Sequence, residues 1–215
     1  YDAAHAFGVQ INNNSILNYG EMSILSFHAT KMFNTMEGGA IICQDEKTKQ
    51  RIDYAKNFGF AGETTVVVPG INAKLNEMQS SLGLLQLKQH KDNVNKRKSI
   101  AEKYRNALSK IPGVTLLPVA DNVKWNYGYF PIFIDEAAFG WNRDYLYEKL
   151  KDANIFCRRY FYPLISQFSP YRGLPSADSK NLPTAIEVAN KVLCLPIYSE
   201  LEDHTLEKIF KIIKS

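Results

Sequence analysis

The stretch that decides the fold reads SFHATKMFNTMEGGA and occupies residues 26–40. It overlaps the apolar runs SILSF (residues 23–27) and GAIIC (residues 39–43), both of which we expect to form short buried strands. The polar connection between these runs contains Lys31 and ends in two glycines, which would let the backbone approach a ligand. A lysine is usually a solvated surface residue, but a lysine held in a pocket can form an imine with an aldehyde. Ser26, at the end of the first run, could hydrogen-bond a phosphate.

A carboxylate lies upstream of this stretch. Asp2 is followed by two alanines and then by His5. Such a carboxylate could be a metal ligand, a general base, a partner of a cofactor or a cap of the following turn. Taken alone, neither Asp2 nor Lys31 identifies a function.

Four motifs in order, spread over the whole chain, resemble those of the DegT/DnrJ/EryC1/StrS sugar aminotransferases. SFHATK and the following NTMEGGA are similar to the segment that carries this family's cofactor lysine. DAAHA (residues 2–6) resembles the family's Asp-Ala-Ala-Gln/His-Ala motif. GINAKLNEMQ (residues 70–79) is similar to Gly-x-Asn-x-Arg-x-x-x-x-Gln, and LCLP (residues 193–196) to the late Leu-x-Leu-Pro motif.

The resemblance implies a role for each matching residue. Lys31 stands where the family forms an internal aldimine with pyridoxal 5′-phosphate (PLP), and Asp2 where a carboxylate pairs with the pyridine nitrogen. His5 occupies the position beside the cofactor ring, and Ser26 matches the serine that contacts the phosphate. Asn72 matches an asparagine that reaches the cofactor phosphate of the neighbouring subunit, which implies a homodimer. No metal is implied.

Departures from the family pattern concern the substrate side. Lys74 replaces the commoner arginine, and RYFYPLI (residues 159–165) stands where the family often has His-Tyr-x-Pro-Leu-His. Tyr160 and Tyr162 are therefore candidates only for contacts with the sugar. For His28 we favour a packing or orienting role over a catalytic one.

The family's phosphate loop and the aromatic residue that stacks on the cofactor ring precede the Asp2 motif, and neither is found in this chain. We therefore expect residues 1–215 alone neither to bind PLP tightly nor to catalyse transamination.

The fold class implied by the resemblance is α/β, the type I PLP-aminotransferase fold. We expect residues 1–100 to form the C-terminal part of the large PLP-binding domain and residues 101–215 to form a small α+β domain. Sequence patterns predict the individual elements. These are helices over 46–56, from 76, over 88–110, 143–153, 184–192 and 203–213, strands over 127–134, 155–157 and 193–196, and loops over 59–70 and 163–183.

The implied function is transfer of an amino group from glutamate to a nucleotide-linked keto-sugar, for surface polysaccharide or deoxyamino-sugar biosynthesis. Some relatives are sugar dehydratases in which a histidine replaces the lysine, and Lys31 argues against that activity. An alternative of another class is a non-catalytic fragment or binding module that uses the basic stretch 88–110. That stretch has eight Lys/Arg against Asp92 and Glu102, but no aromatic residues interleave for base stacking, which favours an ordinary solvated helix face.

Composition limits the remaining function classes. The chain has 45% hydrophobic and 22% charged residues, which are ordinary globular proportions. A net charge of +4 is too mild to indicate nucleic acid or an anionic membrane as a partner, and no apolar run approaches the ~20 residues that span a bilayer. Cys43, Cys157 and Cys194 form no metal-binding or disulfide pattern, so we expect a cytoplasmic protein.

Overall fold

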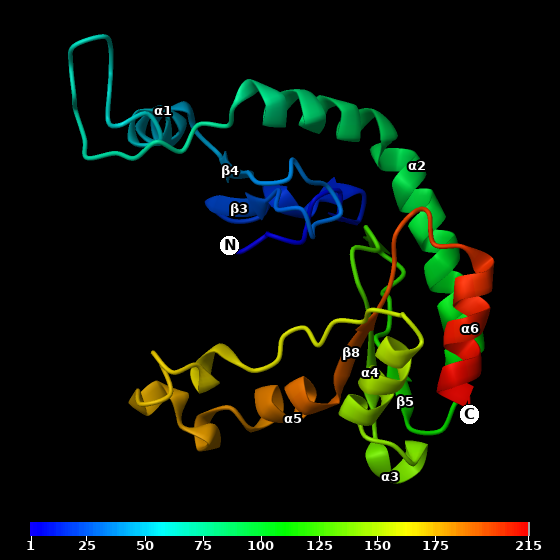
Figure 1. Ribbon diagram of the computed structural model, residues 1–215. Helices are drawn as coiled ribbons and strands as arrows, with labels where there is room; N and C mark the ends of the chain where they lie inside the picture. The colour runs from blue at the N-terminus through cyan, green and yellow to red at the C-terminus, as the bar shows by residue number, and fades with distance from the viewer. Residues whose placement is uncertain (215) are drawn as a thin grey trace. The chain divides into compact units, whose positions relative to one another are not determined.

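A computed structural model describes residues 1–214, which fall into two compact units (Figure 1). The first unit comprises Tyr1–Asp92 together with Val119–Gly128. The second comprises Asn93–Pro118 and the chain from Tyr129 onward. The return of residues 119–128 to the first unit was not expected from the sequence. The assignment of residues 1–100 to a large domain and of 101–215 to a small domain stays a prediction.

The first unit contains the two strands expected around the polar connection. Strand β3 (Met22–Ser26) pairs antiparallel with β4 (Gly39–Cys43), and the register places Ser26 opposite Gly39. Ser23 and Leu25 are buried, whereas Ile24 is 58% exposed. The expectation of strands is confirmed. The expectation that they are buried is only partly met, because alternate side chains point to opposite faces; Ser23 and Leu25 of β3 are buried, and no residue of β4 is.

A second small sheet of the first unit has the order β2-β1-β6. It consists of β1 (Gln10–Ile11), β2 (Asn14–Ser15) and β6 (Val123–Lys124), with a 3-10 turn at Ile16–Asn18. Strand β6 pairs antiparallel with β1, and this pairing brings residues 119–128 into the first unit.

Polar side chains cap both helices that begin in the first unit, as their positions ahead of helical patterns predict. The side chain of Asp45 accepts a hydrogen bond from the Thr48 amide at 2.8 Å and starts α1 (Glu46–Ala55). Asn76 Oδ1 accepts from the Gln79 amide at 2.9 Å at the start of α2 (Glu77–Leu108). The stretches from 76 and over 88–110 were expected as two helices, but they form one helix of 32 residues. It contains no proline, and a single interior glycine costs only about 1 kcal/mol.

The second unit is built on a three-stranded antiparallel sheet of order β5-β7-β8. Its strands are β5 (Val114–Leu116), β7 (Phe130–Ile134) and β8 (Val192–Leu195). Its helices, besides the second half of α2, are α3 (Glu136–Phe139), α4 (Arg143–Asp152), α5 (Pro183–Lys191) and α6 (Asp203–Lys214). The core contains fully buried side chains from these elements, among them Tyr104, Ile132, Leu146, Leu193 and Ile209.

Two strand predictions in the second unit need correction. Residues 155–157 are not a strand, although Ile155 and Cys157 are buried; only the next residue, Arg158, forms an isolated bridge with Cys194. The strand expected over 127–134 begins only at Phe130, because Tyr127 has a positive φ of 53° that interrupts extended backbone.

The loop expected over 163–183 is confirmed, with 3-10 turns at Ile165–Gln167, Pro175–Ala177 and Ser179–Asn181. Every helix within residues 1–214 is too short or too polar to span a membrane.

Candidate functional site

The carboxyl end of β3 places Asp2 and Ser26 close together. Asp2 forms a parallel bridge with Ile24, and the Ala3 amide donates to the Ile24 carbonyl at 2.9 Å. Ser26 lies two residues further along the same strand. Asp2 Oδ1 accepts from the Ala4 amide at 3.0 Å, so the carboxylate does cap the following turn. This contact uses one carboxylate oxygen of an exposed side chain, and the other oxygen makes no hydrogen bond to residues 1–214.

Lys31 and His5 meet in the same unit, although they lie 26 positions apart in the sequence. Lys31 Nζ is 3.2 Å from His5 Nε2, and the Lys31 amide donates to the His28 carbonyl at 2.9 Å, which fixes the turn. Partial burial and the positive charge of Lys31 lower the pKa of His5 below its usual 6.5, while Asp2 acts in the opposite direction. A neutral imidazole can accept a hydrogen bond from Lys31 Nζ.

Ser26 is available as a donor at this strand end. Its Oγ accepts from the His28 amide at 3.3 Å, which leaves its own hydroxyl hydrogen free for a further acceptor. His28 is exposed and makes local contacts, with Nδ1 2.8 Å from Thr30 Oγ1 and Nε2 3.6 Å from Glu37 Oε1. These contacts support the orienting role that the sequence favours for His28.

Asn72 lies apart from this cluster within the first unit. It forms an isolated bridge with Asn57, and no contact given for the described residues joins it to Lys31 or Asp2. Lys74, which replaces the family's arginine, donates to Asn57 Oδ1 at 2.5 Å and lies 5.0 Å from the centre of the Phe58 ring. Lys74 therefore stabilises the loop that carries Asn72.

An aromatic cluster that the sequence analysis missed supports the Lys31 turn. Phe7 stacks on Phe33 with ring centres 4.1 Å apart, and Phe27 packs edge-on against both rings. These residues lie directly after the DAAHA motif and on both sides of Lys31, so the packing fixes both segments. His90 in α2 is half-buried, with its ring 5.1 Å from that of Phe7, and burial lowers its pKa; its charged sequence surroundings would instead predict a surface residue.

Asn126 is a second supporting residue that carried no signal in the sequence. Its Nδ2 donates to the carbonyls of His5 and Phe7 at 2.8 and 2.9 Å, and its Oδ1 accepts from the Gly128 amide at 3.1 Å. The side chain is 4% exposed. It fixes the backbone at His5 from a segment more than a hundred residues away in the sequence, which no local pattern can reveal.

The residues at the end of β3 fit PLP by their chemistry. Lys31 supplies an amine for the aldehyde, Asp2 a free carboxylate oxygen for a protonated pyridine nitrogen, and Ser26 a hydroxyl donor for the phosphate. His5 adds a ring nitrogen beside the amine. The backbone and side-chain contacts described above bring these four residues together.

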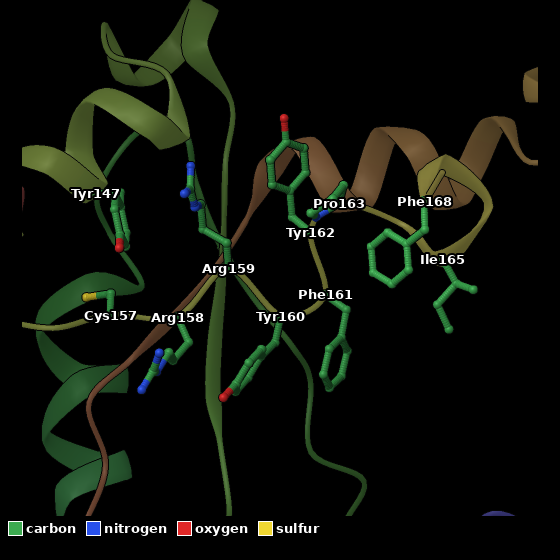
Figure 2. A pocket seen from close by; sticks show the side chains of 10 residues that line it. All are labelled: Tyr147, Cys157, Arg158, Arg159, Tyr160, Phe161, Tyr162, Pro163, Ile165 and Phe168. Atoms are coloured by element: carbon green, nitrogen blue, oxygen red, sulfur yellow. The ribbon is translucent and has the colours of Figure 1, made fainter. Parts of the chain in front are cut away.

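In the second unit, a cavity of about 500 Å³ lies along residues 157–163 (Figure 2). Both predicted sugar-side residues, Tyr160 and Tyr162, line it. The remaining lining residues are Tyr147, Cys157, Arg158, Arg159, Phe161, Pro163, Ile165 and Phe168. Burial raises the pKa of Cys157 to about 12, so its thiol stays protonated and unreactive.

Three of the eight basic side chains of the stretch 88–110 make polar contacts within the second unit. Lys103 pairs with Asp203 at 2.5 Å, Arg105 donates to the Leu117 carbonyl at 2.8 Å, and Lys98 is 3.9 Å from Glu102. Arg97 is half-buried. These charges are used in contacts within the second unit, as expected for an ordinary helix surface.

Comparison with known proteins identifies the family. A model of the DegT/DnrJ/EryC1/StrS aminotransferase family matches residues 1–214. The chain is 50% identical over 216 residues to dTDP-4-amino-4,6-dideoxy-D-glucose transaminase of Escherichia coli and 44% identical over 216 residues to that of Shigella dysenteriae. The matches cover 99% and 100% of this chain but 57% and 58% of the relatives, so the chain spans just over half their length.

A solved structure shows the same fold. The crystal structure of DesI in the presence of its TDP-sugar product aligns with a TM-score of 0.91 at 32% identity, over 99% of this chain and 54% of DesI. The predicted α/β aminotransferase fold is confirmed. The chain belongs to the DegT/DnrJ/EryC1/StrS aminotransferase family.

Proposed function

We propose that the protein carrying this chain is a PLP-dependent enzyme that moves an amino group from glutamate to a nucleotide-linked keto-sugar. The observation that carries the proposal is the Lys31 amine, 3.2 Å from His5, in a cluster with a carboxylate and a serine at one strand end. The printed names of the relatives at 50% and 44% identity describe transaminases of a dTDP-linked amino sugar. They support a nucleotide-linked acceptor.

Binding of the cofactor would involve four side chains of the first unit. PLP, when bound, supplies a ring that takes up negative charge from the α-carbon of an amino acid. Lys31 Nζ would attach it covalently, and Ser26 would donate a hydrogen bond to its phosphate. Asp2 would hold a proton on the pyridine nitrogen, because an adjacent carboxylate favours the protonated cation.

Lys31 is the residue proposed to transfer the proton, and His5 contacts its amine. An amino-acid substrate would displace Lys31 from the cofactor, and the neutral amine of Lys31 could then take the proton from the substrate α-carbon and deliver it to C4′ of the cofactor. His5, with its lowered pKa, is neutral near pH 7, so its ring nitrogen can accept a hydrogen bond from Lys31 Nζ and orient that side chain. The carboxylate of Asp2 acts on the pKa of His5 in the opposite direction to Lys31, so both charges bear on the same imidazole.

The second unit would hold the acceptor. Its cavity carries tyrosine and phenylalanine rings, which pack on the apolar faces of sugars and bases, together with arginines suited to anionic groups. Tyr160 and Tyr162 are the residues proposed for sugar contact. Asn72 would reach a cofactor held by the neighbouring subunit, in a cytoplasmic homodimer. One relative at 28% identity is named a spore coat polysaccharide biosynthesis protein, which supports a role in surface polysaccharide synthesis.

The test uses the full-length protein with PLP, glutamate and a dTDP-linked 4-keto-6-deoxy sugar. We expect an aminated nucleotide sugar by mass spectrometry, with one 2-oxoglutarate formed per amine transferred. Lys31→Ala should yield no product, whereas Lys47→Ala on exposed α1 serves as the matched control and should retain the wild-type rate. A dehydrated sugar without amination, or equal turnover by Lys31→Ala, would contradict the proposal. Salt-dependent binding to a polyanion without turnover would support the binding-module alternative.

A further inference from the structure

Two adjacent arginines of the cavity point in opposite directions. Arg158 lies in extended backbone, since its amide donates to the Cys194 carbonyl at 3.0 Å and its carbonyl accepts from the Cys194 amide at 2.7 Å. Neighbouring side chains of extended backbone alternate between two faces. In Figure 2, Arg158, Tyr160 and Phe161 extend to one side of the segment, and Arg159 and Tyr162 extend to the other.

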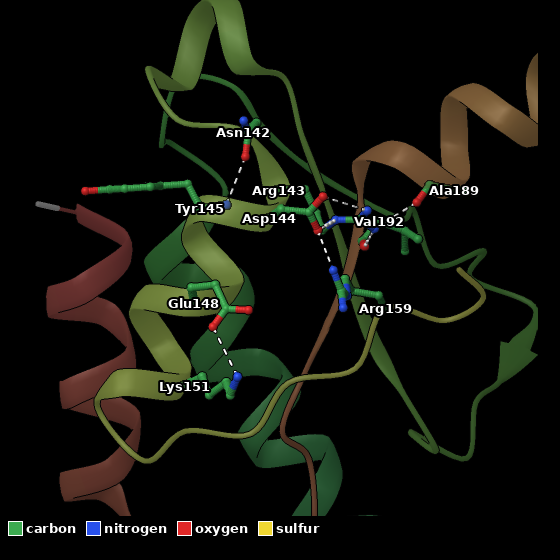
Figure 3. Close-up of polar contacts among 9 residues, drawn as sticks. All are labelled: Asn142, Arg143, Asp144, Tyr145, Glu148, Lys151, Arg159, Ala189 and Val192. Carbon is green, nitrogen blue, oxygen red and sulfur yellow. Dashed lines mark hydrogen bonds and ion pairs between the residues drawn. The ribbon is translucent and has the colours of Figure 1, made fainter. Parts of the chain in front are cut away.

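The side that carries Arg159 is fixed by an ion-pair network that is anchored on the buried Arg143 (Figure 3). Arg159 Nη1 donates to Asp144 Oδ1 at 2.8 Å, and Arg143 Nε lies 2.7 Å from the same oxygen. Arg143 is 2% exposed, and its Nη1 donates to the carbonyls of Ala189 and Val192 at 2.8 and 3.2 Å. We call Arg143, Asp144 and Arg159 the arginine frame. It joins α4 and the end of α5 to the cavity segment.

Tyr162 belongs with this frame. Its ring centre is 4.5 Å from the Arg143 guanidinium carbon and 5.5 Å from that of Arg159. Arg159 also lies 4.4 Å over the ring of Tyr147. Arg159 is therefore held by a carboxylate that it shares with Arg143 and is covered by two aromatic rings, so its guanidinium has fewer free donors for a further anion than that of Arg158.

The side of the segment that carries Arg158 is exposed to solvent. Arg158 is exposed, and its guanidinium has no carboxylate partner within residues 1–214. Tyr160 stacks on Phe161 with ring centres 4.7 Å apart, and the edge of Tyr129 supports it at 5.4 Å. Phe161 is 62% exposed. An unpaired guanidinium beside two supported aromatic rings offers a bidentate donor for a phosphate group and a planar apolar surface for a base or sugar.

We propose that Arg158 binds the diphosphate of the nucleoside-diphosphate portion of the acceptor, with Tyr160 and Phe161 contacting its base or sugar. The inference rests on the proposed function and refines it. Of the two tyrosines proposed for sugar contact, Tyr160 contacts the ligand and Tyr162 holds the arginine frame. Arg159, at the position where the family often has a histidine, is a positioning residue.

The test measures binding of thymidine diphosphate and, separately, of inorganic pyrophosphate to the full-length protein by calorimetry. Arg158→Gln should weaken both by at least about tenfold, the effect of losing one charge-assisted phosphate contact. It should also flatten the salt dependence of binding, with an unchanged melting temperature. Arg172→Gln removes an exposed arginine outside the cavity and is the matched control, expected to bind both probes as the wild type does.

A substitution in the arginine frame should affect stability more than ligand binding. Arg159→Gln should lower the melting temperature and weaken thymidine diphosphate far less than Arg158→Gln does. Equal affinity of the wild type and Arg158→Gln for both probes overturns the inference, while transamination by the wild type leaves the proposed function intact. A larger loss of affinity in Arg159→Gln than in Arg158→Gln also overturns it. Absence of both nucleotide binding and transamination in the wild type overturns the inference and the proposed function together.

Discussion

Replacement of Arg143 by lysine tests the arginine frame through stability. Arg143 is 2% exposed and donates from Nη1 to the carbonyls of Ala189 and Val192. Lysine keeps the charge but has a compact ammonium that cannot reproduce the planar fork. Losing a hydrogen bond between a charged donor and a buried carbonyl costs about 1.5–3 kcal/mol. The lysine ammonium can still donate to one of the two carbonyls. We therefore expect Arg143→Lys to lower the free energy of unfolding by about 2–3 kcal/mol.

The measurement needs a probe confined to the second unit. The chain has two tryptophans, so Trp125→Phe leaves Trp141, which packs against Phe139 and Tyr145 beside Arg143. Urea unfolding followed by Trp141 fluorescence then reports on this unit. In the same background, Arg172→Lys is the control and should change the unfolding free energy by less than about 0.5 kcal/mol. If Arg143→Lys also lowered the unfolding free energy by less than about 0.5 kcal/mol, the buried contacts of Arg143 would contribute nothing to stability, which would refute the reasoning.

The remaining predictions concern the first unit in the full-length protein. Lys31→Ala should abolish transamination and the visible absorbance of bound cofactor, because the amine proposed to hold the cofactor is removed; turnover within about tenfold of wild type would count against this role. Asp2→Asn should retain cofactor but slow turnover by at least about 100-fold, and an unchanged rate would leave Asp2 as a cap only. Without cofactor, His5 should titrate below 6.5 by NMR. Its pKa should rise in Lys31→Met and fall in Asp2→Asn, and shifts of the opposite sign would contradict the proposed coupling.

Local signals predicted much of this structure. Asp45 and Asn76 are short polar side chains ahead of helical patterns, and each accepts the expected amide hydrogen bond. The strands on either side of the Lys31 turn followed from apolar runs bounded by polar and glycine residues. The ordered motifs predict a common site for Asp2, His5, Ser26 and Lys31, and these residues lie close together at the end of β3.

Features that depend on distant residues could not be read from the sequence. Asn126 supports the His5 backbone across 121 positions, and Asp144 pairs with Arg159 across 15 positions without any helical or strand period linking them. The apolar residues 155–157 resemble a strand, yet they are buried without strand pairing. A run of three apolar residues is equally typical of a buried loop and of a paired strand. Which of the two forms depends on the elements that pack against the run.

Covalent trapping of the cofactor tests the central claim most directly. The full-length protein is incubated with PLP, reduced with borohydride and digested, and the peptides are sequenced by mass spectrometry. The account predicts one stable pyridoxyl phosphate adduct per chain, on Lys31, and its loss in Lys31→Ala, while Lys47→Ala is labelled like the wild type. Labelling of a different lysine, or no adduct above that of free lysine, would contradict it.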